Sequence, residues 1–454
     1  GAGLDDYWTA TLASRVGAGG FIWAFVDEAV QRAPGQFDTA GNAAPDGILG
    51  PHREKEGSYY TVRQIWSPVQ IGMTALPNGF DGTLPVQNRY DSTDLASVDF
   101  SWQLVRFDFQ NPLAGNTAAG NSTSGHTVQA EGSARTGSIQ PGASGSLALG
   151  LPADRAGAQA LLLDAKDATG RLIGKWSWML EAPAAIRASI VPAASSGSAL
   201  ATDDGATLTV SASGTTYTFA RANGTLTGVT AGGRSFALKN GPTLSVGSAT
   251  LTALSGVAEG NDYVITASYS GNLEQLVWRV RGDGWLSLDY RYGLQGAFDF
   301  LGIDFDCAEA EVSGAQWLGR GPSRVWKNRL RGPWHDVWQR AKNDAITGQR
   351  WDFPEFKGYF DDVYWARLAT NAGSIEIVMD SPGLFLRLFT PTNGPNPQLA
   401  AAAFPAHDLS ILHAIPPIGD KFLAAAEHGP QSAPNPIDGT LSARLYFHFV
   451  PSAP

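Results

Sequence analysis

The first feature of this sequence that could do chemistry is the carboxylate pair Asp27 and Glu28, which follows an apolar run. Paired carboxyl groups can act as acid and base, or as acid and nucleophile, in hydrolysis. Adjacent residues of an extended strand point to opposite faces, so we predict that these two do not form such a pair with each other. Asp27 or Glu28 is expected to bind a ligand hydroxyl or to hold Arg32. A helix-capping or salt-bridged carboxylate is the alternative.

Metal-ligating and nucleophilic side chains are scattered along the chain. Of the seven histidines, only His407 and His413 lie near each other, and no third ligand follows at metal spacing. The sequence therefore predicts no structural zinc site. The single cysteine, Cys307, excludes an intramolecular disulfide and is expected to be a buried small apolar residue. No phosphate-binding loop, dinucleotide fingerprint or calcium-loop pattern is evident, and no cofactor is predicted.

The overall composition narrows the class of ligand. The chain carries 42 acidic and 32 basic residues, which gives a formal net charge of −10. Nucleic-acid binders need clustered Lys and Arg, so no nucleic-acid partner is predicted, whereas a neutral hydroxylated ligand fits. No apolar run approaches the ~20 residues that cross a bilayer, and we predict a soluble protein with no membrane partner. The compartment is left open, with the bacterial periplasm and the extracellular medium as options.

The N-terminal part of the chain shows helical spacing on both sides of an apolar run. Residues 4–15 place apolar side chains at four-residue intervals and predict a short helix, and 56–66 predict another, which ends before Pro68. The run 19–26 predicts a strand of a parallel sheet covered on both faces, with a buried helical segment as the alternative. A long loop over 33–51 follows it. A single parallel strand cannot satisfy its own edges, so it needs neighbours that this chain does not supply.

Beyond Ser67 the apolar period changes from about 3.6 to 2, which indicates half-buried antiparallel strands. Residues 67–184 fit one immunoglobulin-like β-sandwich. The Ala-, Ser- and Pro-rich segment 183–205 predicts a linker. Alternation then resumes across the strong hairpin turn at 282–284 and continues to the end of the chain. The sequence thus predicts a mainly β protein whose last unit, 185–454, is one large antiparallel sandwich.

Several segments resemble glycoside hydrolase family 2 enzymes of the β-galactosidase type. Residues 19–28 (GGFIWAFVDE) and 46–53 (DGILGPHR) resemble the end of the (β/α)8 catalytic barrel of that family. Residues 88–95 (NRYDSTDL) resemble the sandwich that follows the barrel. Residues 219–226 (FARANGTL) and 317–322 (WLGRGP) resemble the large C-terminal sandwich. These segments occur in the order of the family and at domain-sized spacing.

The resemblance implies that residues 1–66 are the last strand and helix of the barrel and that strands one to seven precede this chain. The nucleophile and acid/base glutamates of the family lie on those earlier strands, so no catalytic residue is predicted here. The expected function is the C-terminal part of a retaining exo-β-glycosidase that removes terminal β-linked sugars from oligo- or polysaccharides. By itself the chain is predicted to be inactive, and its partners are the carbohydrate substrate and the missing N-terminal part of the same enzyme.

The resemblance also assigns substrate binding to Trp23, Asp27, Asp46 and His52. Trp23 would stack on the apolar face of a pyranose, with barrel core as the alternative, and its peptide bond to Ala24 is a candidate cis bond. Many relatives carry Asp where this chain has Ala24, which leaves the identity of the sugar open. Asp46 would lie beside the sugar and a monovalent or divalent cation, or would only shape a turn. His52 begins the last barrel helix and either reaches the site or has a structural role.

Two other functions fit parts of the sequence. A non-catalytic carbohydrate-binding or assembly module of two sandwiches, with residues 1–66 as a docking arm, fits the 14 tryptophans and the charge balance. It gives no reason for the apolar run 19–26. A sugar epimerase built on the large sandwich would need a histidine and a carboxylate that converge in one pocket.

Overall fold

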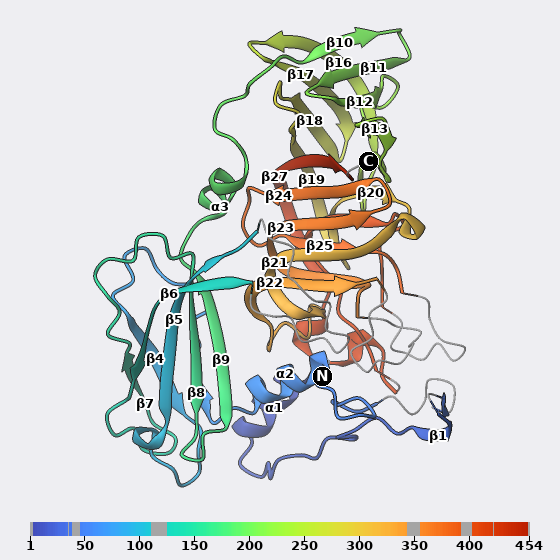
Figure 1. Cartoon of the computed structure of the whole chain (residues 1–454). Helices are drawn as coiled ribbons and strands as arrows, with labels where there is room; N and C mark the ends of the chain where they lie inside the picture. Colours follow the sequence, from blue (N-terminus) through green and yellow to red (C-terminus); the bar gives the residue numbers. More distant parts are fainter. Residues whose placement is uncertain are drawn as a thin grey trace.

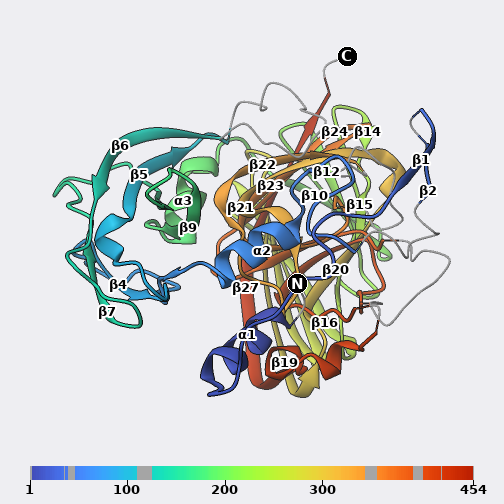
Figure 2. The same cartoon turned by 90° about the horizontal axis from the view of Figure 1, so that it is seen from below.

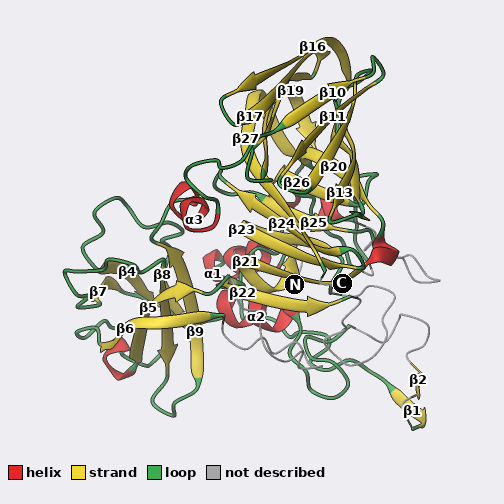
Figure 3. Cartoon of the chain, turned by 45° about the horizontal axis from the view of Figure 1, so that its top comes forward, coloured by secondary structure: helices red, strands yellow, loops and turns green. Residues whose placement is uncertain are grey.

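The computed structural model describes residues 3–34, 36–38, 46–109, 125–342, 355–391, 402–420 and 422–452. These residues lie mainly in strands of antiparallel sheets, as the sequence predicted. Helices are few and flank the sheets (Figure 3). Two β units lie side by side, and the N-terminal helices lie at the bottom of the view (Figure 1).

The N-terminal segment forms the two predicted helices, α1 (Leu4–Ala13) and α2 (Gly57–Ile65). The rings of Trp8 and Trp66 pack between them with their centroids 5.2 Å apart. A small apolar cluster of Ile48 and its neighbours joins the helices to the preceding chain. Seen from below, α1 and α2 lie against the large β unit (Figure 2). The segment has a small core and depends on the surface that it packs on.

The strand predicted over 19–26 does not form in this chain. Among the described residues of the run, Val26 alone makes a ladder contact, an isolated parallel bridge to Leu49. Strands are held by hydrogen bonds to neighbouring strands, and the short stretch 46–49 offers too few of them. The interpretation of residues 1–66 as the end of a barrel stays a prediction.

The long loop predicted over 33–51 is partly wrong. Strands β1 (Val30–Ala33) and β2 (Gln36–Asp38) form a short antiparallel hairpin that overlaps its start. Residues 39–45 lie outside the described part of the chain. Sequence periodicity cannot reveal a hairpin with arms this short.

The unit predicted over 67–184 is built of two antiparallel sheets around one core. The first sheet has the order β3 (Val69–Gln70), β4 (Thr83–Asn88), β7 (Ser144–Ala148), and the second β6 (His126–Ala134), β5 (Asp99–Phe107), β8 (Ala160–Lys166), β9 (Leu172–Met179). Phe100, Trp102 and Trp176 are among the buried residues between the sheets. The predicted β-sandwich is therefore present, and its immunoglobulin-like character stays a prediction.

The predicted linker 183–205 is wrong over its first part, because helix α3 (Pro183–Ile190) forms there. Pro183 occupies the first turn, where a missing N–H costs nothing. Ile186 is fully buried in an apolar cluster shared by both β units. Burial of one apolar face thus makes a helix from a segment whose composition is typical of a linker.

In its described residues the large unit is one continuous antiparallel system of eighteen strands around a second core. Its strands are β10 (Leu200–Asp203), β11 (Thr207–Ala212), β12 (Thr215–Ala220), β13 (Leu226–Ala231), β14 (Arg234–Ser235), β15 (Leu238–Leu244), β16 (Ala249–Glu259), β17 (Asp262–Gly271), β18 (Leu273–Val280), β19 (Leu286–Phe298), β20 (Leu301–Cys307), β21 (Val312–Val325), β22 (Trp334–Ala341), β23 (Gly358–Thr370), β24 (Gly373–Met379), β25 (Phe385–Leu388), β26 (Leu409–Ala414) and β27 (Asn435–Pro451). The hairpin predicted at 282–284 is confirmed by the pairing of β18 with β19. Cys307 is buried, as predicted. The last strand, β27, pairs with both β19 and β24.

The two β units share an apolar interface. The second sheet of the sandwich buries Leu104 in its own core and the next residue, Val105, against Trp365 and other residues of the large unit. Polar contacts surround this cluster: the Ser177 hydroxyl and Nδ1 of His335 are 2.9 Å apart. Both faces of that sheet are therefore covered, which fixes the two units relative to each other.

Helix α2 docks on the large unit at a point that requires glycine. The Thr61 hydroxyl donates to the carbonyl of Arg331 at 2.8 Å, and the N–H of Gly332 donates to the Gln64 side chain. Gly332 has φ +107°, and a Cβ there would lie 2.6 Å from the Thr61 nitrogen. A side chain at residue 332 would both strain the backbone and push α2 away.

We expect Gly332→Ala to lower the free energy of unfolding more than a matched change at Gly170. Gly170 also has a positive φ, +81°, but its added Cβ would meet nothing within 4 Å. Gly170→Ala should therefore cost only the backbone term of about 1–2 kcal/mol. Urea unfolding of both variants measures the difference, and equal losses would show that the approach of α2 is not tight.

Candidate functional site

The predicted sugar-binding tryptophan lies on an exposed aromatic face. The exposure of residues 21–26 alternates: Phe21, Trp23 and Phe25 are exposed, while the residues between them are half-buried. Trp23 is 80% exposed and Phe25 61%. Ile22 and Val26 pack on the small core beneath. We call Phe21, Trp23 and Phe25 the aromatic face.

Backbone contacts bring three of the four predicted site residues into one stretch. The Trp23–Ala24 peptide is cis, as the resemblance implied. The Ala24 N–H donates to the carbonyl of Asp46 at 3.1 Å, and the Gly47 N–H donates to Asp27 Oδ1 at 2.8 Å. The fourth residue, His52, is exposed at the surface. The backbones of Trp23, Asp27 and Asp46 thus lie close together. Their side chains differ in environment, because that of Trp23 is exposed and that of Asp27 is buried.

Trp23 borders a pocket of about 630 Å³ between the N-terminal segment and the loop after β26. This volume is typical of small-molecule sites. Its apolar wall includes Tyr7, Phe21, Ile22 and Trp66, and its polar groups are Asp6, Asp420, Glu427 and His428. Sequence analysis missed Asp420, Glu427 and His428 because about 400 positions separate them from Trp23 and they form no motif. His428 Nε2 lies 3.4 Å from Asp420 Oδ2, so a histidine and a carboxylate meet beside the aromatic wall.

Asp27 faces away from the aromatic face and into the protein, where it meets Glu56. Asp27 is 5% exposed, whereas Glu28 is exposed, which confirms that the two adjacent carboxylates point to opposite sides. The option that Asp27 or Glu28 holds Arg32 is not seen among the described residues, where Arg32 forms an ion pair with Asp38 at 2.7 Å. Arg32 belongs to the β1–β2 hairpin, and that hairpin supplies a nearer carboxylate.

The Asp27 and Glu56 carboxyl groups form a proton-sharing pair. Burial raises the pKa of Asp27 to about 6, despite the hydrogen bond from Gly47. Burial raises the pKa of Glu56 to about 8, and the nearby charges of Asp27 and Glu355 add to the shift. Two carboxylates this close cannot both be ionised at low cost, so one proton stays on the pair near neutral pH.

Charged side chains of the large unit lie close to the Asp27–Glu56 pair. Burial would raise the pKa of Glu355, but the guanidinium groups of Arg324, Arg329 and Arg340 hold it below its usual value. Arg324 Nη2 lies 3.7 Å from Glu355 Oε1. Arg329 also acts on Glu56 and opposes its pKa rise. The pair is therefore part of the contact between the N-terminal segment and the large unit.

The chain shows weak and partial similarity to known carbohydrate-active proteins. A stretch of 110 residues is 29% identical to a β-galactosidase of Actinobacillus pleuropneumoniae, covering 22% of this chain and 10% of that enzyme. The chain thus matches a small part of the length of this relative. No family model matches the chain.

Two solved structures show a distant likeness. The protein HI1317 aligns over 55% of this chain and 98% of its own length, with a TM-score of 0.28 and 7% identity. A cycloalternan-forming enzyme from Listeria monocytogenes, in complex with a pentasaccharide substrate, aligns over 84% of this chain and 30% of its own, with a TM-score of 0.20 and 9% identity. TM-scores this low place the chain in neither fold.

No group of three or more His, Cys, Asp or Glu side chains in the described residues is arranged to hold a metal ion. A cation beside Asp46 stays a prediction. None of the described helices is long and apolar enough to cross a membrane.

We expect the protein to lose stability as the pH rises through the range of the carboxyl pair. In the unfolded chain Glu56 ionises near its ordinary value of 4.5, whereas in the folded chain it holds its proton to about pH 8. Between these values unfolding releases a proton, so stability falls with rising pH. Glu56→Gln removes this proton and should flatten the fall, as read from thermal melting curves across the range.

Glu28→Gln is the matched control, because Glu28 is exposed and adjacent to Asp27. It should melt with the same pH dependence as the unchanged protein. Parallel melting curves for Glu56→Gln and the unchanged protein would contradict the proton-sharing pair.

Proposed function

We propose that this chain is the C-terminal part of a retaining exo-β-glycosidase of β-galactosidase type, which removes terminal β-linked sugars from oligo- or polysaccharides. The nucleophile and acid/base glutamates then lie on polypeptide upstream of it. The observation that carries the proposal is the aromatic face, an exposed apolar surface on a segment whose one ladder contact is a parallel bridge. Such a segment is completed by further parallel strands and by a layer that covers its exposed side.

The pocket beside the aromatic face supports sugar binding. An exposed indole offers a flat surface for the C–H groups of a pyranose, and Trp23 stands at the edge of a volume that would hold one or two sugar rings. Carboxylates of Asp420 and Glu427 can accept hydrogen bonds from sugar hydroxyls. In this proposal Trp23 forms one wall of the terminal-sugar subsite, and the missing barrel strands form the others.

The partial similarity to a β-galactosidase supports the same class of enzyme. Asp27 is then a structural carboxylate that holds Gly47 and Glu56, and Asp46 is the residue nearer the sugar. The alternative, a non-catalytic carbohydrate-binding module, shares the sugar ligand but needs no further polypeptide.

The experiment is complementation. The purified chain is mixed with a separately produced polypeptide that carries the first seven strands of a family 2 barrel, and hydrolysis of an aryl β-galactoside is measured. Each part alone should be inactive, and the mixture should turn over substrate. Trp23→Ala should lower kcat/KM of the mixture about tenfold or more, while Trp23→Phe, which keeps an aromatic ring, should lose less.

Phe422→Ala is the control, because Phe422 is also an exposed aromatic, at 79%, but is not among the residues that border the pocket. It should leave kcat/KM unchanged. Hydrolysis by the purified chain alone at enzyme-like rates would contradict the proposal, and sugar binding without complementation would favour the non-catalytic module.

A further inference from the structure

A second cavity, of about 870 Å³, lies between the sandwich, helix α2 and the large unit. Four cationic side chains line it, Arg89, Lys175, Arg320 and Arg331, together with the amides of Gln64, Gln70 and Gln87. Its far wall carries His335, Asp361 and Asp362. A cavity this rich in arginine and lysine is unusual in a chain whose net charge is −10.

Three of the four cations have a carboxylate partner. Lys175 lies 2.6 Å from Asp164, and Arg320 lies 2.9 Å from Asp361. Arg331 has one carboxylate partner, Asp5, at 2.7 Å. Among the described residues Arg89 forms no ion pair with a carboxylate, and its Nε donates to the neutral side chain of Gln87 at 3.1 Å.

Paired strands hold Arg89 and Arg331 at the same edge of the cavity. Gln70 of β3 lies directly opposite Gln87 of β4. Gln87 accepts from Arg89, and Gln70 accepts from Arg331 at 3.4 Å. The Arg89 backbone is fixed as well, because its N–H donates to the carbonyl of Pro68 at 2.7 Å. Neutral amides thus orient both guanidinium groups, and of the two only Arg89 lacks a carboxylate partner among the described residues.

The electrostatics of Arg89 agree with this geometry. Partial burial lowers the pKa of Arg89, and the charge of Arg331 lowers it further, while Asp5 opposes both. A cation whose pKa is lowered in the folded state makes that state less stable. An anion bound next to Arg89 would offset this cost.

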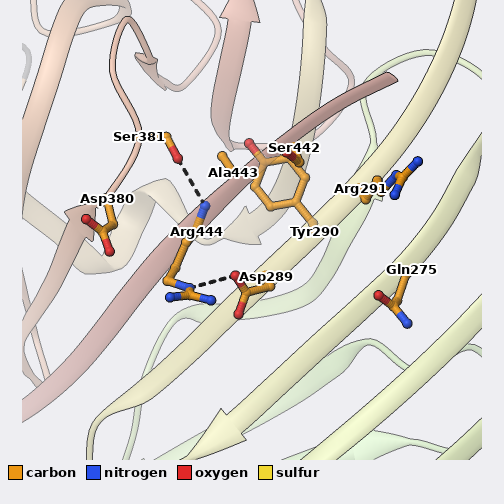
Figure 4. A pocket seen from close by; sticks show the side chains of 9 residues that line it. All are labelled: Gln275, Asp289, Tyr290, Arg291, Asp380, Ser381, Ser442, Ala443 and Arg444. Atoms are coloured by element: carbon orange, nitrogen blue, oxygen red, sulfur yellow. Dashed lines mark hydrogen bonds and ion pairs between the residues drawn. The ribbon is translucent and has the colours of Figure 1, made fainter. Parts of the chain in front are cut away.

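A smaller hollow on the large unit shows the contrast. This hollow, of about 330 Å³, is lined by residues of β18, β19 and β27 and contains Arg444 (Figure 4). Arg444 Nε donates to Asp289 Oδ1 at 2.6 Å, so its charge is compensated within the protein. Arg89 differs from Arg444, because its Nε donates to a neutral amide and not to a carboxylate.

We infer that the cavity beside Arg89 and Arg331 is a binding site for a small organic anion that carries a carboxylate or phosphate group. The planar fork of a guanidinium group matches both oxyanions with two parallel hydrogen bonds. The cavity is large enough for a sugar-sized ligand, and the amide and hydroxyl groups around it, Gln64 and Ser177 among them, suit a polar body. This inference does not depend on the proposed glycosidase function.

The experiment measures binding of two probes to the full chain by calorimetry at low salt. Inorganic phosphate and glucuronate are titrated separately, with glucose as the neutral comparison. We expect one or both anions to bind at millimolar concentration or below, glucose not to bind, and affinity to fall as sodium chloride is added. Binding of glucuronate alone identifies an acidic sugar as the ligand, and binding of phosphate identifies a phosphorylated one.

Variants assign the binding to Arg89. Arg89→Gln should weaken binding about tenfold or more, because a charged hydrogen-bond donor is lost. Gln87→Leu keeps the charge but removes the amide that orients Arg89, so a smaller loss is expected. Arg444→Gln makes the same charge change in the other hollow and should leave the affinity unchanged.

Melting temperatures show whether a variant that loses binding is still folded. Arg89 is exposed and holds no carboxylate, so Arg89→Gln should melt at or above the temperature of the unchanged protein. No binding of either anion by the unchanged chain, or equal binding by Arg89→Gln, would overturn the inference.

Discussion

Two carboxyl groups that share one proton lie where the N-terminal segment meets the large β unit, and the position of the segment depends on them. Asp27 and Glu56 could not both be charged in that place, and the arginines behind them are already engaged by Glu355. The shared proton allows residues 23–27 and α2 to pack on the large unit without an unpaired buried charge. Because Asp27 also holds Gly47, the same contact places Trp23 beside its pocket.

The cavity beside Arg89 is more fully enclosed by the rest of the molecule than the aromatic face is. The cavity has walls from three parts of the chain, and the apolar cluster around Val105 and Trp365 fixes those walls relative to one another. The aromatic face has support on one side only. The proposed anion of the cavity would meet a preformed site, whereas the proposed sugar at Trp23 would need further protein to enclose it. The difference arises because the sandwich and the large unit bury apolar surface against each other, whereas the aromatic face stays exposed.

Sequence analysis was most successful where one period dominates a long stretch. The alternation in the sandwich and the large unit, the two N-terminal helices and the burial of Cys307 were all predictable, because local pattern and tertiary burial agree there. Helix α3 was not, since only tertiary burial of Ile186 distinguishes it from a linker. The partners of Asp27 and the polar side of the Trp23 pocket come from distant segments, and no spacing in the sequence relates Trp23 to His428.

The last strand has a consequence for how the protein is made. Strand β27 is the last of the described strands and lies between β19 and β24, paired with both (Figure 1). Its inward residues, Leu445 and Phe447 among them, are part of the main core. Until β27 has left the ribosome, β19 and β24 therefore each expose an unpaired edge, and the core between them is open to water. The large unit cannot complete its core before this strand has been synthesised, although most of its other strands are made earlier.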